Sequence, residues 1–217
     1  MLPDRIIRHI DRRFGLSSAH PGFLRRSLPP GVSYLHCLGG VAFVLYIALL
    51  FTGMLLSFHY VPSEKEAFQS IVKITREVPL GGLVRGMHRW AGHLLIVFIF
   101  LHTARVVAHR AYRPPRELNW IAGALLFALV FASGFTGSLL PWDRKAYWVA
   151  VVGTGVAGTA PLLGETLLQC VRGGPEVDGG TLLRFYSLHV LWLPFATALL
   201  LWAHFHMVKR QGITGGL

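Results

Sequence analysis

The chain has 217 residues, of which 53% are hydrophobic and only 14% are charged. This composition is too apolar for an ordinary water-soluble domain and predicts a membrane protein. The net charge of +11 would also suit a nucleic-acid-binding protein. However, the basic residues gather in loops beside apolar segments, which is typical of membrane topology, so we expect no nucleic-acid partner.

The first part of the chain, residues 1–30, is a basic arm that we interpret as an amphipathic surface helix attracted to anionic membrane lipid. No short apolar core with a small-residue cleavage site follows this arm, so we expect the membrane spans themselves to target the protein. Residues 31–217 are then expected to form the folded domain.

Four apolar segments are each long enough to cross about 30 Å of hydrocarbon, and they predict an all-α membrane protein built as a four-helix transmembrane bundle. The predicted spans are, in chain order, about 35–60, 86–109, 119–140 and 183–207. The third and fourth spans are separated by a long loop, residues 141–182. Its segments PWDRKAYW and APLLGETLLQCV are predicted to be short amphipathic helices on the membrane surface.

The charges of the loops predict the direction of the spans. With four spans, the N-terminus, the second loop and the C-terminus share one side, which carries many basic and few acidic residues. These basic residues are Arg5, Arg8, Arg12, Arg13, Arg25, Arg26, Arg110, Arg113, Arg116, Lys209 and Arg210. The positive-inside rule therefore places both termini on the cytoplasmic or stromal side. Cys37 and Cys170 then lie near opposite faces of the membrane and are not expected to pair.

Two histidine pairs occur at nearly equal spacing in the second and fourth spans. His88 and His102 are fourteen positions apart, and His189 and His204 are fifteen apart. These spacings are about 3.9 and 4.2 helical turns, so each pair lies near one face of its helix, with about 21 Å between its members. Because the two spans run in the same direction, His88 is level with His189 near the outer face, and His102 is level with His204 near the inner face.

Level, facing imidazoles on parallel helices match bis-histidine axial ligation of haem iron, so the pattern predicts two haems. A single histidine in a span is more simply explained as a solvated or hydrogen-bonded side chain, but two pairs in register are not. His93 points away from His88 and is not expected to bind iron. His206 is a weaker rival of His204, because it lies about 100° off the face defined by His189.

Glycines repeat the same spacing in the other two spans. Gly39 and Gly53 in the first span, and Gly123 and Gly137 in the third, are each fourteen positions apart. Glycine has no side chain, so these positions would leave room for two flat macrocycles at two depths of the bundle. The alternative is the ordinary small-residue packing of membrane helices.

Four arginines are candidates to bind haem propionates. Arg85 lies one turn before the outer histidine of the second span, and Arg105 lies one turn after the inner one. Charge-assisted hydrogen bonds from a guanidinium group suit a propionate carboxylate. Arg89 and Arg116 are further candidates. The alternative for all four is that the guanidinium reaches lipid phosphate while the aliphatic stem stays in the membrane.

Several motifs resemble the cytochrome b6 family, the short, split form of cytochrome b. They are HCLGG, RGMHRW, LHTARV, RPPRELNW, TGSLLPWD, TLLRFYSLH and the tail KRQGITGGL, and they extend from about Pro30 to Leu217. The fourteen residues between His189 and His204, and the end of the chain after four spans, are also similar to the split form. The resemblance implies a di-haem electron-transfer subunit of a quinol:cytochrome c or plastocyanin oxidoreductase, in a bacterial inner membrane or a thylakoid.

The resemblance also implies the course of the electrons. In this family, quinol is oxidised near the outer face, and one electron goes to a Rieske iron–sulfur protein and on to a c-type cytochrome. The other electron crosses from the outer haem to the inner haem and reduces quinone there, coupled to proton translocation. A subunit IV-like chain carries the remaining helices, the complex is a dimer, and a chain of this kind is not active alone.

Two further sites follow from the resemblance alone. One is a quinol-oxidation site in the loop of residues 141–182, for which the candidate residues are Pro141, Trp142, Asp143, Tyr147 and Trp148. The other is Cys37 in HCLGG, which is expected to hold an additional haem through one thioether bond beside the inner haem. Composition alone would make Cys37 a small buried hydrophobic residue. Cys170 is expected to be structural.

Two other functions remain compatible with such a bundle. One is a b-type haem membrane anchor of a dehydrogenase or hydrogenase, which would not need the PWD motif followed by a long amphipathic loop. The other is a haem-free bundle whose histidines relay protons, which leaves the glycine spacing without a reason.

Overall fold

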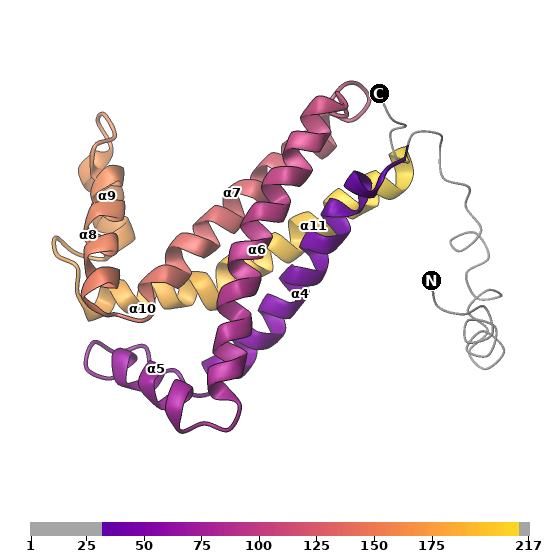
Figure 1. The fold of residues 1–217 in the computed structure, drawn as a ribbon. Coiled ribbons are helices and arrows are strands. Elements are labelled where there is room, and N and C mark those ends of the chain that lie inside the picture. The colour runs from indigo at the N-terminus through magenta and orange to yellow at the C-terminus, as the bar shows by residue number, and fades with distance from the viewer. Residues whose placement is uncertain (1–31, 213–217) are drawn as a thin grey trace. The chain divides into compact units, whose positions relative to one another are not determined.

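A computed structural model describes residues 32–212, so the predicted N-terminal arm lies outside the described residues (Figure 1). Every regular element between residues 32 and 212 is helical. Four segments are long and apolar enough to cross a membrane, namely Tyr34–Ser57, Gly81–Ala108, Glu117–Leu139 and Gly179–Gln211. The predicted all-α bundle with four spans is therefore confirmed, although the second and fourth spans begin a few residues earlier than predicted.

Three of the spans are regular helices. The first consists of a short 3-10 turn, η1 (Tyr34–Cys37), followed directly by α4 (Leu38–Ser57). The second is α6 (Gly81–Ala108), and the third is α7 (Glu117–Leu139). None of these segments contains proline. An uninterrupted helix bonds its own backbone groups, which is what a segment surrounded by lipid requires.

The fourth span changes its helical geometry near the outer end. It consists of α10 (Gly179–Ser187), a π-helical turn, η2 (Leu188–Trp192), and α11 (Leu193–Gln211). Pro194 lies in the first turn of α11 and has no amide hydrogen for a helical hydrogen bond. The π-helical turn η2 directly precedes α11. Such turns often occur at functional sites, and this one contains His189.

The four spans alternate in direction, as expected, and contacts between distant segments join both ends of the bundle (Figure 1). At one end, Arg116 before α7 donates a hydrogen bond of 3.1 Å to the backbone carbonyl of Gln211 at the end of α11. At the other end, the hydroxyl of Tyr60 after α4 donates to the carbonyl of Leu140 after α7. The ring of Tyr60 also stacks on Tyr186 of α10, with 5.4 Å between the centroids.

Shorter helices gather at the end of the bundle where α4 and α7 finish (Figure 1). Helices α8 (Arg144–Gly158) and α9 (Gly164–Arg172) form a hairpin there, so the structure has a helix at each surface segment predicted in the loop of residues 141–182. Helix α5 (Ala67–Arg76) is not among the elements predicted from the sequence. Its buried residues have ordinary helical spacing and are Ala67, Ser70 and Ile74.

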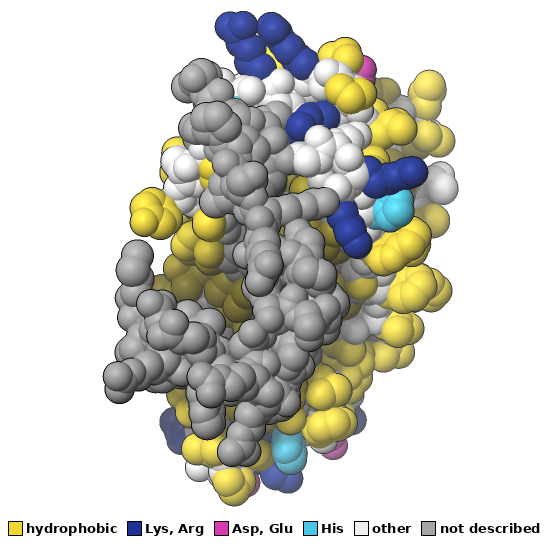
Figure 2. Space-filling view, turned by 90° about the vertical axis from the view of Figure 1, so that its right-hand side faces the viewer, with side chains coloured by type: hydrophobic (Ala, Val, Ile, Leu, Met, Phe, Trp, Pro, Cys, Tyr) yellow, Lys and Arg dark blue, Asp and Glu magenta, His cyan; other side chains and the backbone are white. Residues whose placement is uncertain are grey.

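The outer surface of the spans is apolar. Large hydrophobic side chains that are at least half exposed occur on all four spans, including Val44, Phe51, Trp90, Phe100, Ile121, Phe195 and Trp202. Figure 2 shows hydrophobic side chains through the middle of one face and Lys and Arg side chains mainly toward its upper part. A broad apolar band with charged ends is the surface of a protein surrounded by lipid.

Candidate functional site

The outer histidine pair is formed by α6 and the π-helical turn of the fourth span. The ring centroids of His88 and His189 lie 6.3 Å apart, and their planes are inclined by 79°. A metal ion bound by one nitrogen of each ring at about 2.0–2.1 Å would hold these two nitrogens about 4 Å apart. The remaining distance of about 2 Å between the centroids is what the two nitrogen-to-centroid distances within the rings add up to. The spacing therefore fits a single metal ion between the two imidazoles.

A buried threonine contacts the other nitrogen of each outer histidine. Nδ1 of His88 lies 2.9 Å from Oγ1 of Thr52, and Nδ1 of His189 lies 3.1 Å from Oγ1 of Thr136. Each threonine hydroxyl already donates its proton to the carbonyl four residues earlier, at 2.7 and 2.9 Å. Each hydroxyl therefore accepts a hydrogen bond from Nδ1–H. This leaves a free lone pair on Nε2, which is the form of imidazole that binds a metal.

The inner pair, His102 and His204, lies further along α6 and α11, and the two rings are close enough to interact electrostatically. Within residues 32–212, Nδ1 of each ring is buried without a hydrogen-bond partner, although the backbone carbonyl of Asn119 lies close to His204. Nε of Arg105 is also buried and unpartnered in this part of the chain. A buried guanidinium nitrogen without an acceptor is rare in native proteins, so Arg105 has a donor available for a further group at this site.

Each glycine of the predicted set lies against one histidine ring. The distances from an added Cβ atom to the nearest ring atom are 3.0 Å for Gly39 and His102, 3.1 Å for Gly53 and His88, 3.5 Å for Gly123 and His204, and 2.6 Å for Gly137 and His189. A larger residue would crowd the imidazole at three of the four positions. The glycine spacing thus matches the histidine spacing because each glycine lies against one imidazole, and the room for the macrocycles that the sequence predicts at these positions stays a prediction.

The two helices that carry the histidines hardly touch each other. Helix α6 packs along α4, and α11 packs along α7, whereas α6 and α11 make almost no direct backbone contact. Among the described residues, no group of three or more His, Cys, Asp or Glu side chains could hold a metal ion. A metal between two imidazoles therefore needs its other ligands from a cofactor. A haem would supply such ligands and would be held by one histidine of each span, so these residues fit haem.

The structure distinguishes the predicted ligands from the other histidines of these spans. His206 is exposed and stacks on Trp202, with 5.9 Å between the ring centroids. His93 is exposed beside Trp90. His204 is better placed than His206 to face the inner histidine of α6.

The four predicted arginines have different surroundings. Arg105, which interacts electrostatically with the inner histidine of α6, has the unpartnered Nε and is the best placed to receive a carboxylate. Arg116 donates a hydrogen bond to the backbone carbonyl at the end of α11. Arg85 donates a hydrogen bond of 3.3 Å to Thr75 of α5, and Arg89 is exposed.

The predicted quinol-site residues surround the turn between α7 and α8. The rings of Trp142, Tyr147 and Trp148 form a chain of edge-to-face contacts, with centroid distances of 6.4 and 5.7 Å. Trp142 has a positive φ of 49° and packs against both buried apolar clusters at this end of the bundle. Pro141 before it is partly buried. Asp143 caps α8, because its Oδ1 accepts a hydrogen bond of 2.8 Å from the backbone N–H three residues later.

This cap predicts how Asp143 variants behave. Asp143→Ala is expected to lower the free energy of unfolding by about 1 kcal/mol, because the first turn of α8 loses its acceptor. Asp143→Asn is expected to keep nearly all of the stability, since asparagine caps helices as well as aspartate does. Thermal unfolding in detergent, followed by circular dichroism, measures both variants. Equal destabilisation by alanine and asparagine would show that the carboxylate charge, rather than the cap, is what matters at this position.

The two cysteines lie at opposite ends of the bundle and are both free and exposed. Cys37 ends η1 and stands two residues before Gly39, which contacts the inner histidine of α6. Cys170 lies in α9. The two cysteines are therefore unpaired in the described structure, and Cys37 is at the depth of the inner pair.

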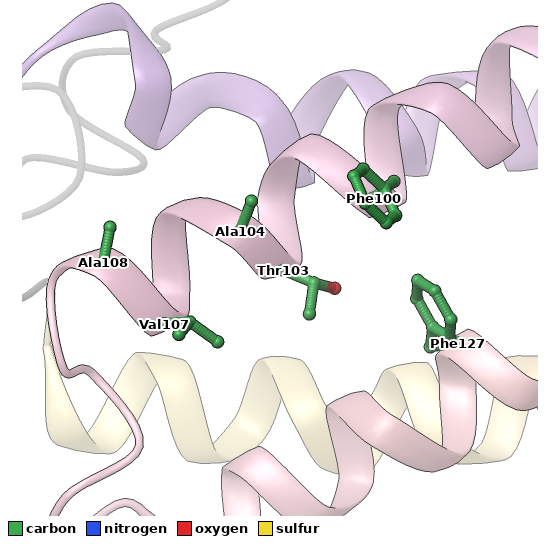
Figure 3. A pocket seen from close by; sticks show the side chains of 6 residues that line it. All are labelled: Phe100, Thr103, Ala104, Val107, Ala108 and Phe127. Atoms are coloured by element: carbon green, nitrogen blue, oxygen red, sulfur yellow. The ribbon is translucent and has the colours of Figure 1, made fainter.

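An apolar groove of about 380 Å³ lies between α6 and α7 (Figure 3). Its lining residues are Phe100, Thr103, Ala104, Val107 and Ala108 of α6 and Phe127 of α7. Only Thr103 brings a side-chain hydroxyl to the groove. The lining therefore suits an apolar group.

Thr52 and Thr136 are functional candidates that were not singled out from the sequence. A signal was nevertheless present, because each stands in the tripeptide Phe-Thr-Gly directly before an outer glycine. The inner glycines, Gly39 and Gly123, have leucine and alanine before them.

Comparison with known proteins covers nearly the whole chain. The sequence profile described as "Cytochrome b/b6/petB" matches residues 23–212. The menaquinol:cytochrome c reductase cytochrome b subunit of Geobacillus thermodenitrificans is 45% identical over 85% of this chain and 83% of its own. Cytochrome b6 of Porphyra purpurea is 41% identical over 88% of each chain. Cytochrome b6 of Synechococcus sp. (strain JA-3-3Ab) is 38% identical over 96% of this chain and 97% of its own.

A solved structure shows the same fold. A chain of "Hyperthermophilic respiratory Complex III" superposes with a TM-score of 0.86 at 28% sequence identity, over 96% of this chain and 56% of that chain. The matched residues 23–212 include the four predicted ligand histidines and the four glycines that contact them. With four apolar spans, the chain is an integral membrane protein, and it belongs to the cytochrome b/b6 family.

Proposed function

We propose that this chain is the di-haem electron-transfer subunit of a quinol:cytochrome c oxidoreductase. The observation that carries the proposal is the outer pair, His88 and His189, whose ring centroids lie 6.3 Å apart, the separation that one metal ion bound by both imidazoles would require. A second pair, His102 and His204, follows on the same two spans, with the two rings close enough to interact electrostatically. The proposal agrees with the names of the relatives, which are cytochrome b6 and menaquinol:cytochrome c reductase cytochrome b subunit.

Membership of the cytochrome b/b6 family implies b-type haem. We assign His88 and His189 to the outer haem, and His102 and His204 to the inner haem. Haem, when bound, supplies one-electron oxidation and reduction. The chain orients the imidazoles through the threonine and glycine contacts, and its apolar spans keep both sites out of water. Two such sites at two depths of one bundle suit the passage of electrons across a membrane.

We assign the propionates of the inner haem to Arg105 and Arg116, and those of the outer haem to Arg85 and Arg89. Arg105 supports this assignment most directly, because its buried Nε has no partner within the described part of the chain. Arg85 keeps further N–H donors after its bond to Thr75. A guanidinium group offers the paired donors that a carboxylate accepts.

The outer end is proposed to form one wall of a quinol-oxidation site. Trp142, Tyr147 and Trp148 present connected aromatic rings there, and Tyr147 and Trp148 are 39% and 58% exposed. Flat apolar surfaces of this kind suit a quinol ring. Pro141 shapes the turn that presents these rings. Asp143 acts on the site by holding the start of α8.

The remaining parts of the proposal concern the assembly. The relatives named as reductase subunits support the expectation of a subunit IV-like chain, a Rieske protein, a c-type cytochrome partner and a dimeric complex, with no turnover by this chain alone. Both termini are proposed to lie on the cytoplasmic or stromal side. Arg110, Arg113, Lys209 and Arg210 at that end of the bundle support this orientation.

Cys37 is proposed to hold a third haem by a thioether bond, because its exposed thiol lies at the depth of the inner pair. A pyridine haemochrome count before and after acid–acetone extraction tests this together with the di-haem assignment. We expect two extractable haems and one retained haem per chain. Cys37→Ser is expected to lose only the retained haem, and Cys170→Ser, the matched control, is expected to lose none.

The same count discriminates between the possible functions. Two extractable haems with none retained would keep the di-haem assignment and reject the thioether bond. A folded chain without haem would reject the proposal and favour the proton-relay bundle. Reduction of a c-type cytochrome by menaquinol, assayed in the purified complex, separates the proposed function from that of a dehydrogenase or hydrogenase anchor, which would not catalyse it.

A further inference from the structure

We propose that Thr52 and Thr136 are positioning residues that lower the redox potential of the outer haem by accepting hydrogen bonds from its two histidines. Among the described residues, no side-chain hydroxyl makes the equivalent contact with the histidines of the inner pair. The inference rests on the proposed assignment of haem to the two histidine pairs.

The geometry restricts what each threonine can do. Both side chains are almost completely buried, with exposed fractions of 3% for Thr52 and 4% for Thr136. Their hydroxyl protons are directed at backbone carbonyls at 2.7 and 2.9 Å. The oxygen lone pairs therefore face Nδ1 of the histidines, at 2.9 and 3.1 Å. A hydroxyl held in this way accepts a hydrogen bond from the imidazole ring and donates none to it.

The effect on the haem follows from the chemistry of imidazole. An acceptor on Nδ1–H increases the electron density of the ring and strengthens donation from Nε2 to the metal. Stronger donation favours the ferric state over the ferrous state, so the potential falls. Thr52 lies on α4 and Thr136 on α7, so each of the two axial ligands receives one such contact.

The inner pair has the same glycine framework without the hydroxyl groups. Leu38 and Ala122 occupy the positions that correspond to the two threonines. In the described structure, no side-chain hydroxyl contacts Nδ1 of His102 or of His204, although the backbone carbonyl of Asn119 lies close to His204. The two sites therefore share ligand type and helix packing but differ in the groups that contact Nδ1.

A purely structural role is the competing explanation. A threonine in an apolar helix commonly bonds the carbonyl four residues earlier, whether or not it serves a ligand. The carbonyls of Leu49 and Ser133 also lie near the outer rings. Removing a threonine hydroxyl therefore removes one hydrogen-bond acceptor of the histidine and leaves the carbonyl in place. A structural role predicts no selective change of the outer potential.

The test uses the purified complex with Thr52→Val, Thr136→Val and the double variant. Valine keeps the shape of threonine and removes the hydroxyl. Redox titration of the haem absorption bands is expected to show an upward shift of the outer potential, larger in the double variant, with the inner potential unchanged. Thr52→Ser and Thr136→Ser, which keep the hydroxyl, are expected to restore the wild-type value. Thr197→Val is the matched control, since Thr197 is equally buried at 3% in the fourth span and makes no hydrogen bond to a histidine among the described residues.

Each outcome decides the inference. An unchanged outer potential in the double variant, or equal shifts of both potentials, overturns it. If the valine variants lose the outer haem, the serine variants decide: retention at the wild-type potential supports the inference, and equal loss contradicts it. The haem count of the wild-type complex is made first. Absence of haem there rejects the proposed function, whereas two haems with insensitive potentials reject only the role of the threonines.

Discussion

His102→Leu is expected to remove the inner haem and leave the outer haem in place. The iron between His102 and His204 would lose one of its two axial ligands, and leucine offers no lone pair to replace it. The outer pair depends on other side chains of the same helices, with its own threonine and glycine contacts. The expected result is a loss of about half of the extractable haem, of the inner wave in a redox titration, and of electron transfer across the membrane.

His206→Leu provides the matched control for this experiment. His206 is two residues from an inner ligand, is exposed and stacks on Trp202. This variant is expected to keep both haems. Full haem stoichiometry in His102→Leu, or loss of the inner haem in His206→Leu instead, would show that the inner ligand assignment is wrong.

Gly137→Ala is expected to abolish haem binding at the outer site. The added Cβ would lie 2.6 Å from Cε1 of His189 and 3.2 Å from its Nδ1, closer than side-chain atoms approach in folded proteins. The imidazole would have to rotate away, which breaks its contact with Thr136 and the facing geometry with His88. Overpacking of this kind costs about 1–3 kcal/mol, and the outer haem is the group that leaves.

Two other glycine-to-alanine variants are the controls for this result. Gly123→Ala places a Cβ 3.5 Å from His204, which is an ordinary contact, and is expected to retain the inner haem. Gly155→Ala meets nothing within 4 Å, and is expected to be neutral or to stabilise the protein by up to about 1 kcal/mol through helix propensity. Haem content and the reduced absorption spectrum of the three variants provide the comparison. An unchanged outer-haem spectrum in Gly137→Ala would contradict the close packing of glycine against ligand.

The sequence by itself determined the number of spans, their alternating directions and the relative depths of the four histidines along them. In lipid, a spanning segment must bond its own backbone groups, so it forms a helix of known rise and period. Spacing along the chain then converts directly into position along and around the helix. His88 and His189 could thus be predicted to be level, and the glycines of the first and third spans could be predicted to share their depths.

The tertiary structure decided which groups touch at those depths. The period of one helix does not reveal which face of a neighbouring helix lies opposite, so the contact of each glycine with a particular imidazole could not be derived from spacing. For the same reason, the hydrogen bonds of the two outer histidines to Thr52 and Thr136 could not be predicted. The repeated Phe-Thr-Gly tripeptide marked only the positions of the threonines. The π turn around His189 and the cap at Asp143 depend on local backbone geometry that the apolar pattern does not encode. Depth in the membrane is a property of each helix alone, whereas the surroundings of a ligand depend on how two helices pack together.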